Sequence, residues 1–278
     1  MMSGLAVIGI CLTNHVQAQS DPSVLGPVWD LTLSDQARGV AQIVFNANGT
    51  LVGQVQIQTL KRTGGSTDLD DRGLTDDRGG SGSSTNSTSS TVTNMIGSPV
   101  IDGQWGFDPS TQRIVGFLNE GLFIVTATTT NATTNSVSFR GVVRGGSRPR
   151  MTLHGTSPLG RQVFQGVPLQ ALPDISGPYA AIGRRGNTPV VEFFTLSAAG
   201  LNNYDIAGGS PGYTYSGNAI LSARRQLSMF TEADGTNGIN LTMIVGSFNT
   251  NRLNTARSLG SLKGRDSHGS VSLKILDQ

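Results

Sequence analysis

Short apolar segments that alternate with polar residues, separated by turn residues, most constrain the fold of this 278-residue chain. The clearest example is Val40–Phe45, which is followed by Asn48-Gly49 and then by a second alternating segment over 50–59. An Asn-Gly pair in this position predicts a β-hairpin with a type I′ turn, which needs positive φ at both central residues. We therefore expect two antiparallel strands here.

Further β-rich pieces follow at intervals typical of antiparallel sandwiches and barrels. Composition agrees, because Glu and Lys occur only three times each, whereas Gly occurs 37 times. Charged residues make up 14% of the chain, against roughly 25% in an average soluble domain. A mainly helical protein is excluded, and we expect an all-β meander. The pieces span 96–107, 112–118, 122–127, 136–143 and 151–154.

The second half of the chain repeats the order of the first. Gly26 and Gly49 recur as Gly177 and Gly200, both at an offset of 151 (177 − 26 and 200 − 49). An internal duplication predicts two tandem antiparallel β-barrel or β-sandwich domains, and one large sandwich assembled from both halves is the alternative. The later segments 103–117, 122–127 and 140–145 resemble 217–230, 239–245 and 259–264, in that order.

Changes in composition set the expected domain boundaries. Residues 1–18 read as a signal peptide, and β domain 1 follows over 19–156. Within it, 63–90 is almost free of apolar residues and is expected to be a disordered insertion. A proline-containing linker over 157–173 leads to β domain 2 at 174–278.

The amino-terminal segment predicts export to a bacterial periplasm, cell surface or extracellular space. Its apolar run over 5–12 is too short to cross a membrane as a helix, and cleavage after Ala18 fits its small-residue ending. Cys11 is the only cysteine, so the mature chain would form no disulfide, and lipidation of Cys11 stays open. We expect no transmembrane segment; with 6% aromatic residues, an outer-membrane barrel is disfavoured.

Five carboxylates in the expected insertion are a candidate calcium site. Their spacing matches neither an EF-hand loop nor a calcium-binding nonapeptide repeat, so we prefer a solvated loop and leave the calcium alternative for 68–77 open. These carboxylates are Asp68, Asp70, Asp71, Asp76 and Asp77.

No residue is nominated as catalytic, cofactor-binding or metal-ligating. The stretch 208–212 fits the G-x-S-x-G pattern of a hydrolase nucleophile, but Pro211 after Ser210 removes the backbone N–H that an oxyanion hole requires. Only His154 and His268 remain after the signal segment, too few for a typical catalytic zinc site. We expect a protein that is not an enzyme and has no cofactor.

One basic stretch points to a class of partner. Between Glu120 and Asp174 the chain contains no acidic residue, so its arginines could meet a surface polyanion or polysaccharide. Aromatic residues do not interleave with the arginines, which argues against nucleic acid as the partner. The basic residues are Arg140, Arg144, Arg148, Arg150 and Arg161.

Composition and patterning lead to three hypotheses about function. The first is an exported, non-catalytic surface or envelope-associated interaction or structural protein that self-associates or meets a polyanion. The alternative is a β-barrel that binds a small apolar ligand, and the third is an enzyme of unknown class. The ligand-binding residues stay unknown at this level.

Overall fold

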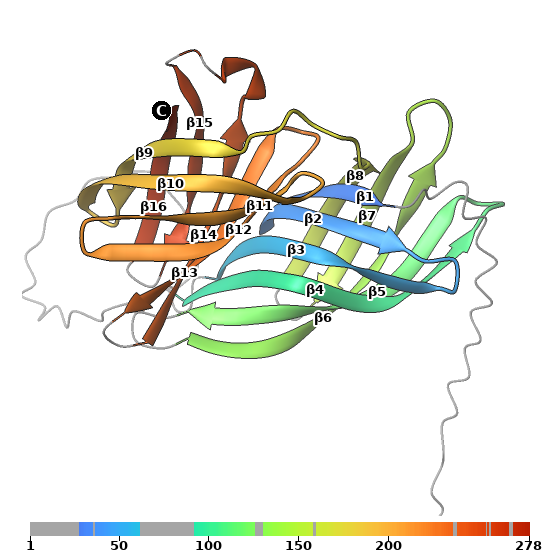
Figure 1. Cartoon of the computed structure of the whole chain (residues 1–278). Helices are drawn as coiled ribbons and strands as arrows, with labels where there is room; N and C mark the ends of the chain where they lie inside the picture. Colours follow the sequence, from blue (N-terminus) through green and yellow to red (C-terminus); the bar gives the residue numbers. More distant parts are fainter. Residues whose placement is uncertain are drawn as a thin grey trace, which may run out of the picture.

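The computed structural model describes residues 28–35, 37–61, 92–125, 130–157, 160–235, 238–253, 255, 257–266 and 269–278. These residues form two closed β-barrels in tandem, each a meander of eight antiparallel strands (Figure 1). The all-β prediction with two tandem domains is confirmed, and both domains are barrels. The expected signal peptide over 1–18 and the insertion over 63–90 lie outside the described residues.

Barrel 1 closes where its first strand pairs with its last over seven consecutive residue positions, from Trp29 opposite Pro168 to Asp35 opposite Gln162. Closure leaves no free sheet edge and separates an inner face from an outer face. The strands are β1 (Trp29–Asp35), β2 (Ala37–Phe45), β3 (Thr50–Lys61), β4 (Val92–Asp108), β5 (Arg113–Val125), β6 (Thr130–Arg144), β7 (Arg150–Ser157) and β8 (Gly160–Pro168).

Barrel 2 closes in the same way, with its first strand between the second and the last. A single 3₁₀ turn, η1 (Thr250–Arg252), precedes the seventh strand. The strands are β9 (Gly177–Arg185), β10 (Thr188–Gly200), β11 (Asn203–Ser210), β12 (Tyr213–Leu221), β13 (Gln226–Gly235), β14 (Gly238–Phe248), β15 (Ser258–Asp266) and β16 (Gly269–Asp277).

The expected linker over 157–173 is the main difference between prediction and structure. Strand β8 occupies 160–168 within it and closes barrel 1, so that barrel ends at Pro168 rather than at 156. The connector is the shorter segment 169–176. Pro168, one of the prolines that suggested a linker, is the last residue of this barrel strand instead.

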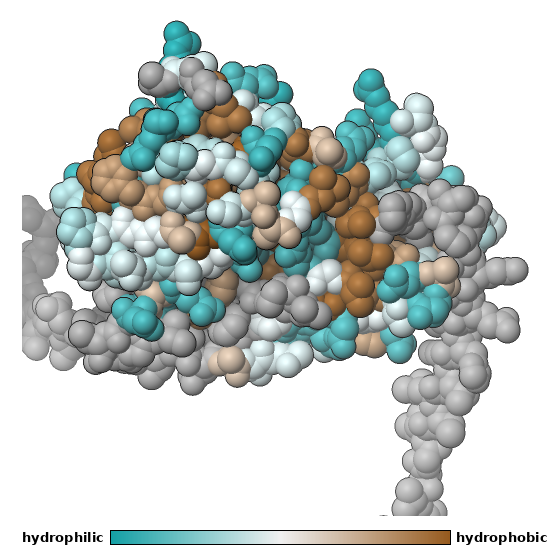
Figure 2. Space-filling model, viewed as in Figure 1, coloured by the Kyte–Doolittle hydropathy of each residue, from teal (hydrophilic) through white to brown (hydrophobic). Residues whose placement is uncertain are grey.

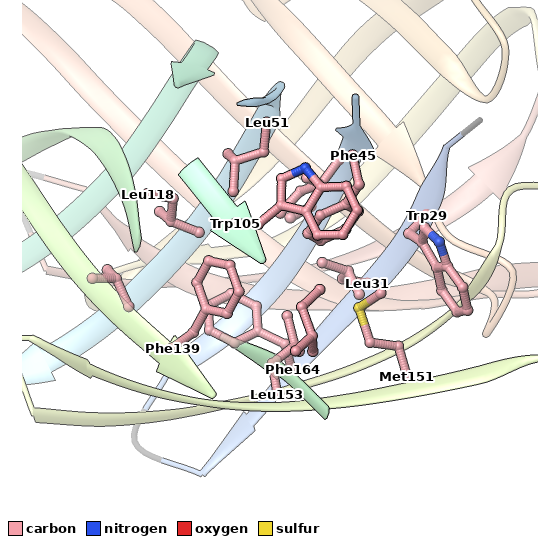
Figure 3. Packing of buried hydrophobic residues seen from close by; sticks show 14 of the residues in the cluster. Trp29, Leu31, Phe45, Leu51, Trp105, Leu118, Phe139, Met151, Leu153 and Phe164 are labelled. Atoms are coloured by element: carbon pink, nitrogen blue, oxygen red, sulfur yellow. The ribbon is translucent and has the colours of Figure 1, made fainter. Parts of the chain in front are cut away.

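Alternation along the strands builds the core of each barrel. Trp29, Leu31 and Leu33 of β1 belong to the barrel 1 cluster, whereas Asp30 and Thr32 between them lie on the outer face, where they are also buried. Figure 3 shows large side chains from several strands meeting inside this barrel. Barrel 2 has its own separate cluster around Tyr179, Phe194 and Phe248. Both interiors are therefore filled with side chains.

Two glycines permit close approach of neighbouring strands at matching places in the two barrels. A Cβ at Gly103 would lie 2.1 Å from the carbonyl oxygen of Phe117, and one at Gly217 would lie 2.1 Å from that of Phe230. The sequence similarity paired Gly103 with Gly217 and Phe117 with Phe230, and the two barrels use these residues alike. Such glycines let strands bend sharply enough to close a small barrel.

Four turns at corresponding ends share one backbone feature. In each turn, the residue immediately before the next strand begins has positive φ. These residues are Gly49 (81°), Gln112 (55°), Asn202 (59°) and Arg225 (59°). The carbonyl of each accepts a hydrogen bond from a strand further on, such as Val143 N to Gln112 O at 3.0 Å and Phe248 N to Arg225 O at 2.8 Å. The turn geometry thus repeats between the barrels.

Some details of the predicted repeat are wrong. In the β2–β3 turn Gly49 alone has positive φ, and its N–H bonds to Asn46 O at 3.0 Å, so the turn is not type I′. The residue equivalent to Gly49 is Asn202, not Gly200. The last two segment pairs of the sequence match are displaced by one strand. By strand order β6 corresponds to β14, but the match paired 140–145, at the end of β6, with 259–264 in β15.

The outer faces of the barrels meet in a mixed apolar and polar interface. Strands β13 and β14 contact β2 and β3, and a separate buried cluster includes Phe230, Met243 and Val245 on their outer face. Gln56 Nε2 donates to Asn218 Oδ1 at 2.8 Å across the junction. The barrels therefore dock directly against each other.

The connector closes one end of barrel 2. Ile175 is fully buried in the barrel 2 cluster, and its carbonyl accepts a hydrogen bond from Tyr179 Oη at 2.6 Å. Asn202 holds the preceding residues by donating to Gln170 O at 2.8 Å and accepting from Leu172 N at 3.1 Å. The connector is thus held on barrel 2 both by the packing of a side chain and by hydrogen bonds to its backbone.

Replacing Gly103 or Gly217 by Ala should lower the free energy of unfolding by more than about 2 kcal/mol, because the new Cβ meets a backbone oxygen that cannot move alone. Urea denaturation measures this. Gly200→Ala is the control, since its Cβ would meet nothing closer than 3.8 Å. If G103A and G217A unfold like G200A, close strand approach does not require these glycines.

Candidate functional site

A largely but not fully buried arginine, whose side chain is 13% exposed, caps the end of barrel 2 opposite the connector. Arg185 of β9 forms a two-point ion pair with Glu192 of β10, from Nε to Oε1 at 2.6 Å and from Nη2 to Oε2 at 3.2 Å. Its Nη1 donates to Asp266 Oδ2 at 2.9 Å and to Thr242 Oγ1 at 3.2 Å. The guanidinium therefore joins four strands across the barrel interior.

Two tyrosines complete this Arg185 cluster. The guanidinium carbon lies 5.4 Å from the ring centroid of Tyr213, and Tyr215 Oη donates to Glu192 Oε2 at 3.3 Å. Burial opposes the charge of Arg185, but hydrogen bonding to Glu192 and its charge raise the arginine pKa overall. Burial, then the charge of Glu192, raises the pKa of Tyr215. The positive charge of Arg185 is compensated by Glu192 and Asp266, so the cluster acts as a structural cap on this end of barrel 2.

Barrel 1 has a different polar group inside. The Glu120 carboxyl of β5 is buried and accepts a hydrogen bond from Asn135 Nδ2 at 2.6 Å. Burial raises the pKa of Glu120 to about 7, although Asn135 and the nearby Gln162 favour its ionised form. Glu120 Oε2 and both polar atoms of the Gln162 side chain have no hydrogen bond of ordinary geometry. Glu120 is thus a lone acid without a partner base among the described residues.

The structure separates the residues that a hydrolase would need to bring together. Ser210 ends β11 of barrel 2 beside the turn formed by Pro211 and Gly212, whereas His154 lies on the outer face of β7 in barrel 1. His268 and the aspartates of 68–77 lie outside the described residues. Within the described part of the chain, no three His, Cys, Asp or Glu side chains gather as a metal site would require.

The arginines singled out from the sequence share one surface. Arg140 and Arg144 of β6 point outward, and they stand directly opposite His154 and Arg150 of β7. Arg161 of β8 lies opposite Thr156, further along the same face. Arg148 is exposed in the β6–β7 turn. We call Arg140, Arg144, Arg150, His154, Arg161 and Arg224 the arginine stripe.

Arg224 joins the stripe from barrel 2, a contribution that sequence reasoning missed. It lies in the β12–β13 turn, and its Nη1 donates to Gln165 Oε1 of β8 at 2.7 Å. Together with Arg144, Arg150 and His154 it lines a groove of about 440 Å³ between the barrels. Only the docking of the barrels places it there, so no sequence signal near 224 indicates it.

The stripe carries uncompensated positive charge. No ion pair joins Arg140, Arg144, Arg150 or Arg161 to a carboxylate of the described residues. Asp30 lies near Arg224 but is buried at the junction, where it accepts a hydrogen bond from Ala223 N. Burial raises its pKa to about 6, although the Ala223 hydrogen bond and the charge of Arg224 act in the opposite direction. The groove itself is lined by no carboxylate among the described residues.

A second hollow, of about 280 Å³, lies over β12 and β13. Glu232 and Asp234 line it together with the hydroxyl residues Thr214 and Ser216. Both carboxylates are exposed, and no described residue adds a third ligand for a metal. This hollow offers less to a ligand than the groove, where charged groups converge from two barrels.

Comparisons of the chain with protein-family models, with curated proteins and with solved structures gave no match. No helix among the described residues is long and apolar enough to cross a membrane. Function is therefore inferred from the geometry of the arginine stripe and of the two barrel interiors.

Replacing Arg185 by Met should lower the free energy of unfolding by about 3–5 kcal/mol, because Glu192 and Asp266 would stay buried without a counter-charge. Thermal and urea denaturation measure this effect. Arg184→Met is the matched control, since Arg184 is the exposed neighbour on the same strand. Equal stability of R185M and R184M would show that the cluster does not stabilise barrel 2.

Replacing Glu120 by Gln should stabilise the protein in a pH-dependent way. The folded-state pKa of about 7 lies above the ordinary value of 4.5, so the wild type loses stability as pH rises from about 4.5 to 7. Relative to the wild type, E120Q should therefore gain about 3 kcal/mol between pH 4 and pH 8.

Urea denaturation at both pH values checks this gain. Glu232→Gln, which changes an exposed carboxylate, is the control and should differ from the wild type by less than about 0.5 kcal/mol at either pH. A pH-independent difference between E120Q and the wild type would contradict the prediction.

Proposed function

We propose that this chain is an exported, non-catalytic protein of the cell envelope that works by binding an anionic partner on its arginine stripe. The observation that carries the proposal is the like-charged pairing of Arg144 with Arg150 directly across the β6–β7 ladder. Arg140 lies opposite His154 further along the same ladder and adds a third arginine to this face.

Such pairing has a physical cost that an anion removes. Side chains directly opposite on antiparallel strands have Cβ atoms about 4.5–5.5 Å apart, and like charges there are destabilising. A carboxylate or sulfate between Arg144 and Arg150 would convert repulsion into charge-assisted hydrogen bonds from two forked donors. The face is therefore better suited to a complex than to free solvent.

The non-catalytic part of the proposal is supported by where the ionisable groups lie. Arg185 and Glu192 are engaged with each other inside barrel 2, and Glu120 lies alone inside barrel 1. Ser210 and His154 belong to different barrels. Export rests on the amino-terminal segment 1–18 alone.

A ligand inside a barrel has less support. Trp29, Trp105 and Phe164 are buried inside barrel 1, with Phe45 and Trp105 packed edge to face at 5.4 Å between ring centroids (Figure 3). An apolar ligand there would have to displace large side chains from a close-packed interior.

Self-association is the second candidate function, and one surface favours it. Ile182 of β9 lies directly opposite Val191 of β10, and both are 48% exposed. Phe193, two residues along β10, is 52% exposed. Figure 2 shows hydrophobic residues over these strands, at the left of the view. The patch is small beside a standard interface, so it ranks below the stripe.

The proposal predicts that labelled dextran sulfate binds the protein and that Arg144→Gln/Arg150→Gln weakens this binding at least tenfold, or by about 1.4 kcal/mol. Fluorescence anisotropy at fixed ionic strength measures it, with neutral dextran as the ligand control. Lys263→Gln/Lys274→Gln is the matched variant, because it removes two exposed charges from the outer face of barrel 2. Equal affinity of both double variants would overturn the proposal.

A further inference from the structure

We infer that the arginine stripe is one continuous site for a linear acidic polysaccharide, which lies along the β6–β7 ladder and ends in the groove between the barrels. This inference rests on the proposed function and adds the class of ligand and its orientation. It depends on the order of the basic groups along the sheet, on the shape of the groove and on the residues that line it.

The basic groups stand in a row rather than in a ring. Arg144 and Arg150 form the first pair, Val142 and Thr152 separate them from the next, and Arg140 and His154 follow. Arg161 then lies beside Thr156, so the positive groups continue along the same face. A row parallel to the strands suits a chain-like ligand, whereas one small anion would be bound by a single pair.

The length of the row supports the same conclusion. Arg161 is level with Ser138, since both pair with Thr156, and Ser138 lies six residues from Arg144 along β6. At about 3.3 Å per residue the row is about 20 Å long. Several acidic units of one extended polymer chain are needed to reach from one end to the other.

The shape of the groove distinguishes a polymer chain from a membrane. Arg224 of barrel 2 and Arg150 of barrel 1 face one hollow of about 440 Å³ at the junction. A flat bilayer surface cannot enter a hollow between two barrels, whereas a single chain can. A polymer in the groove would contact both barrels at once.

The chemistry of the lining favours sugar acids over single-stranded nucleic acid. The residues lining the groove include arginines, Thr152, His154 and Gln165, which donate hydrogen bonds to carboxylate, sulfate and hydroxyl oxygens. None of the described residues lining it is Phe, Tyr or Trp, the large aromatic side chains that form the stacking platforms of single-strand binders. Acidic polysaccharide therefore matches the donors best.

The test measures affinity against chain length. Oligogalacturonate, a carboxylated series, and heparin oligosaccharides, a sulfated series, are titrated from disaccharide to decasaccharide by calorimetry. We expect affinity to rise with length and then level off, and the tighter series identifies the acidic group. Arg140→Gln/Arg161→Gln should weaken the decasaccharide about tenfold and the disaccharide less than about twofold. Arg224→Gln should weaken both, because it changes the groove itself.

The controls separate failure of this inference from failure of the proposed function. Lys263→Gln/Lys274→Gln should leave every affinity unchanged, and circular dichroism checks that each variant is folded. If affinity is independent of length, or if R140Q/R161Q binds the decasaccharide like the wild type, the linear site is wrong. Anionic phospholipid vesicles or single-stranded DNA that bind more tightly than the acidic decasaccharides would also overturn it. In each case the proposed function would still be supported if R144Q/R150Q weakens the binding of dextran sulfate.

Discussion

The hydrogen bonds between the first and last strands of each barrel are the constraint on which the other features depend. The β1–β8 pair closes barrel 1, and β9 closes barrel 2 by pairing with β16. Closure gives every strand an inner and an outer face and fixes which residues belong to each. Arg185 and Glu120 are thereby placed inside, and the arginines of β6–β8 are placed outside in a row. A shift of one residue in register would exchange these faces.

Alternation and turn residues were sufficient to predict the all-β class, two tandem domains and many of the strands. They failed for β8, because Pro168 at its end resembles linker chemistry, and only pairing with β1 shows the segment to be a strand. The Arg185 cluster could not be predicted, since Asp266 lies 81 residues from Arg185 and closure alone brings them together. The place of Arg224 in the stripe could not be predicted for the same reason, because it reaches the stripe across the junction between the barrels. Local patterns predict local structure, and the candidate site depends on distant pairing.

The two barrels share a backbone plan but differ in their interior chemistry. Turns with Gln112 and Arg225 at positive φ repeat, as do the close approaches at Gly103 and Gly217. The polar groups inside do not repeat, because barrel 1 buries the lone acid Glu120, whereas barrel 2 holds the ion pair of Arg185 with the buried Glu192. Backbone geometry therefore constrains the sequence more tightly than the interior side chains do. This explains why glycines and turns revealed the repeat while charged residues did not.

The fixed connector has a consequence for the entropy of binding. Ile175 is buried in barrel 2, and Asn202 holds the backbone of Gln170 and Leu172, so relative motion of the barrels is restricted before any partner arrives. Two domains on a flexible linker would lose that freedom on binding a shared ligand, and the loss would weaken the complex. Here the freedom is already lost on folding. Arg224 is held in the same groove as Arg144 and Arg150 in the free protein, and a ligand that contacts both barrels meets a preorganised surface.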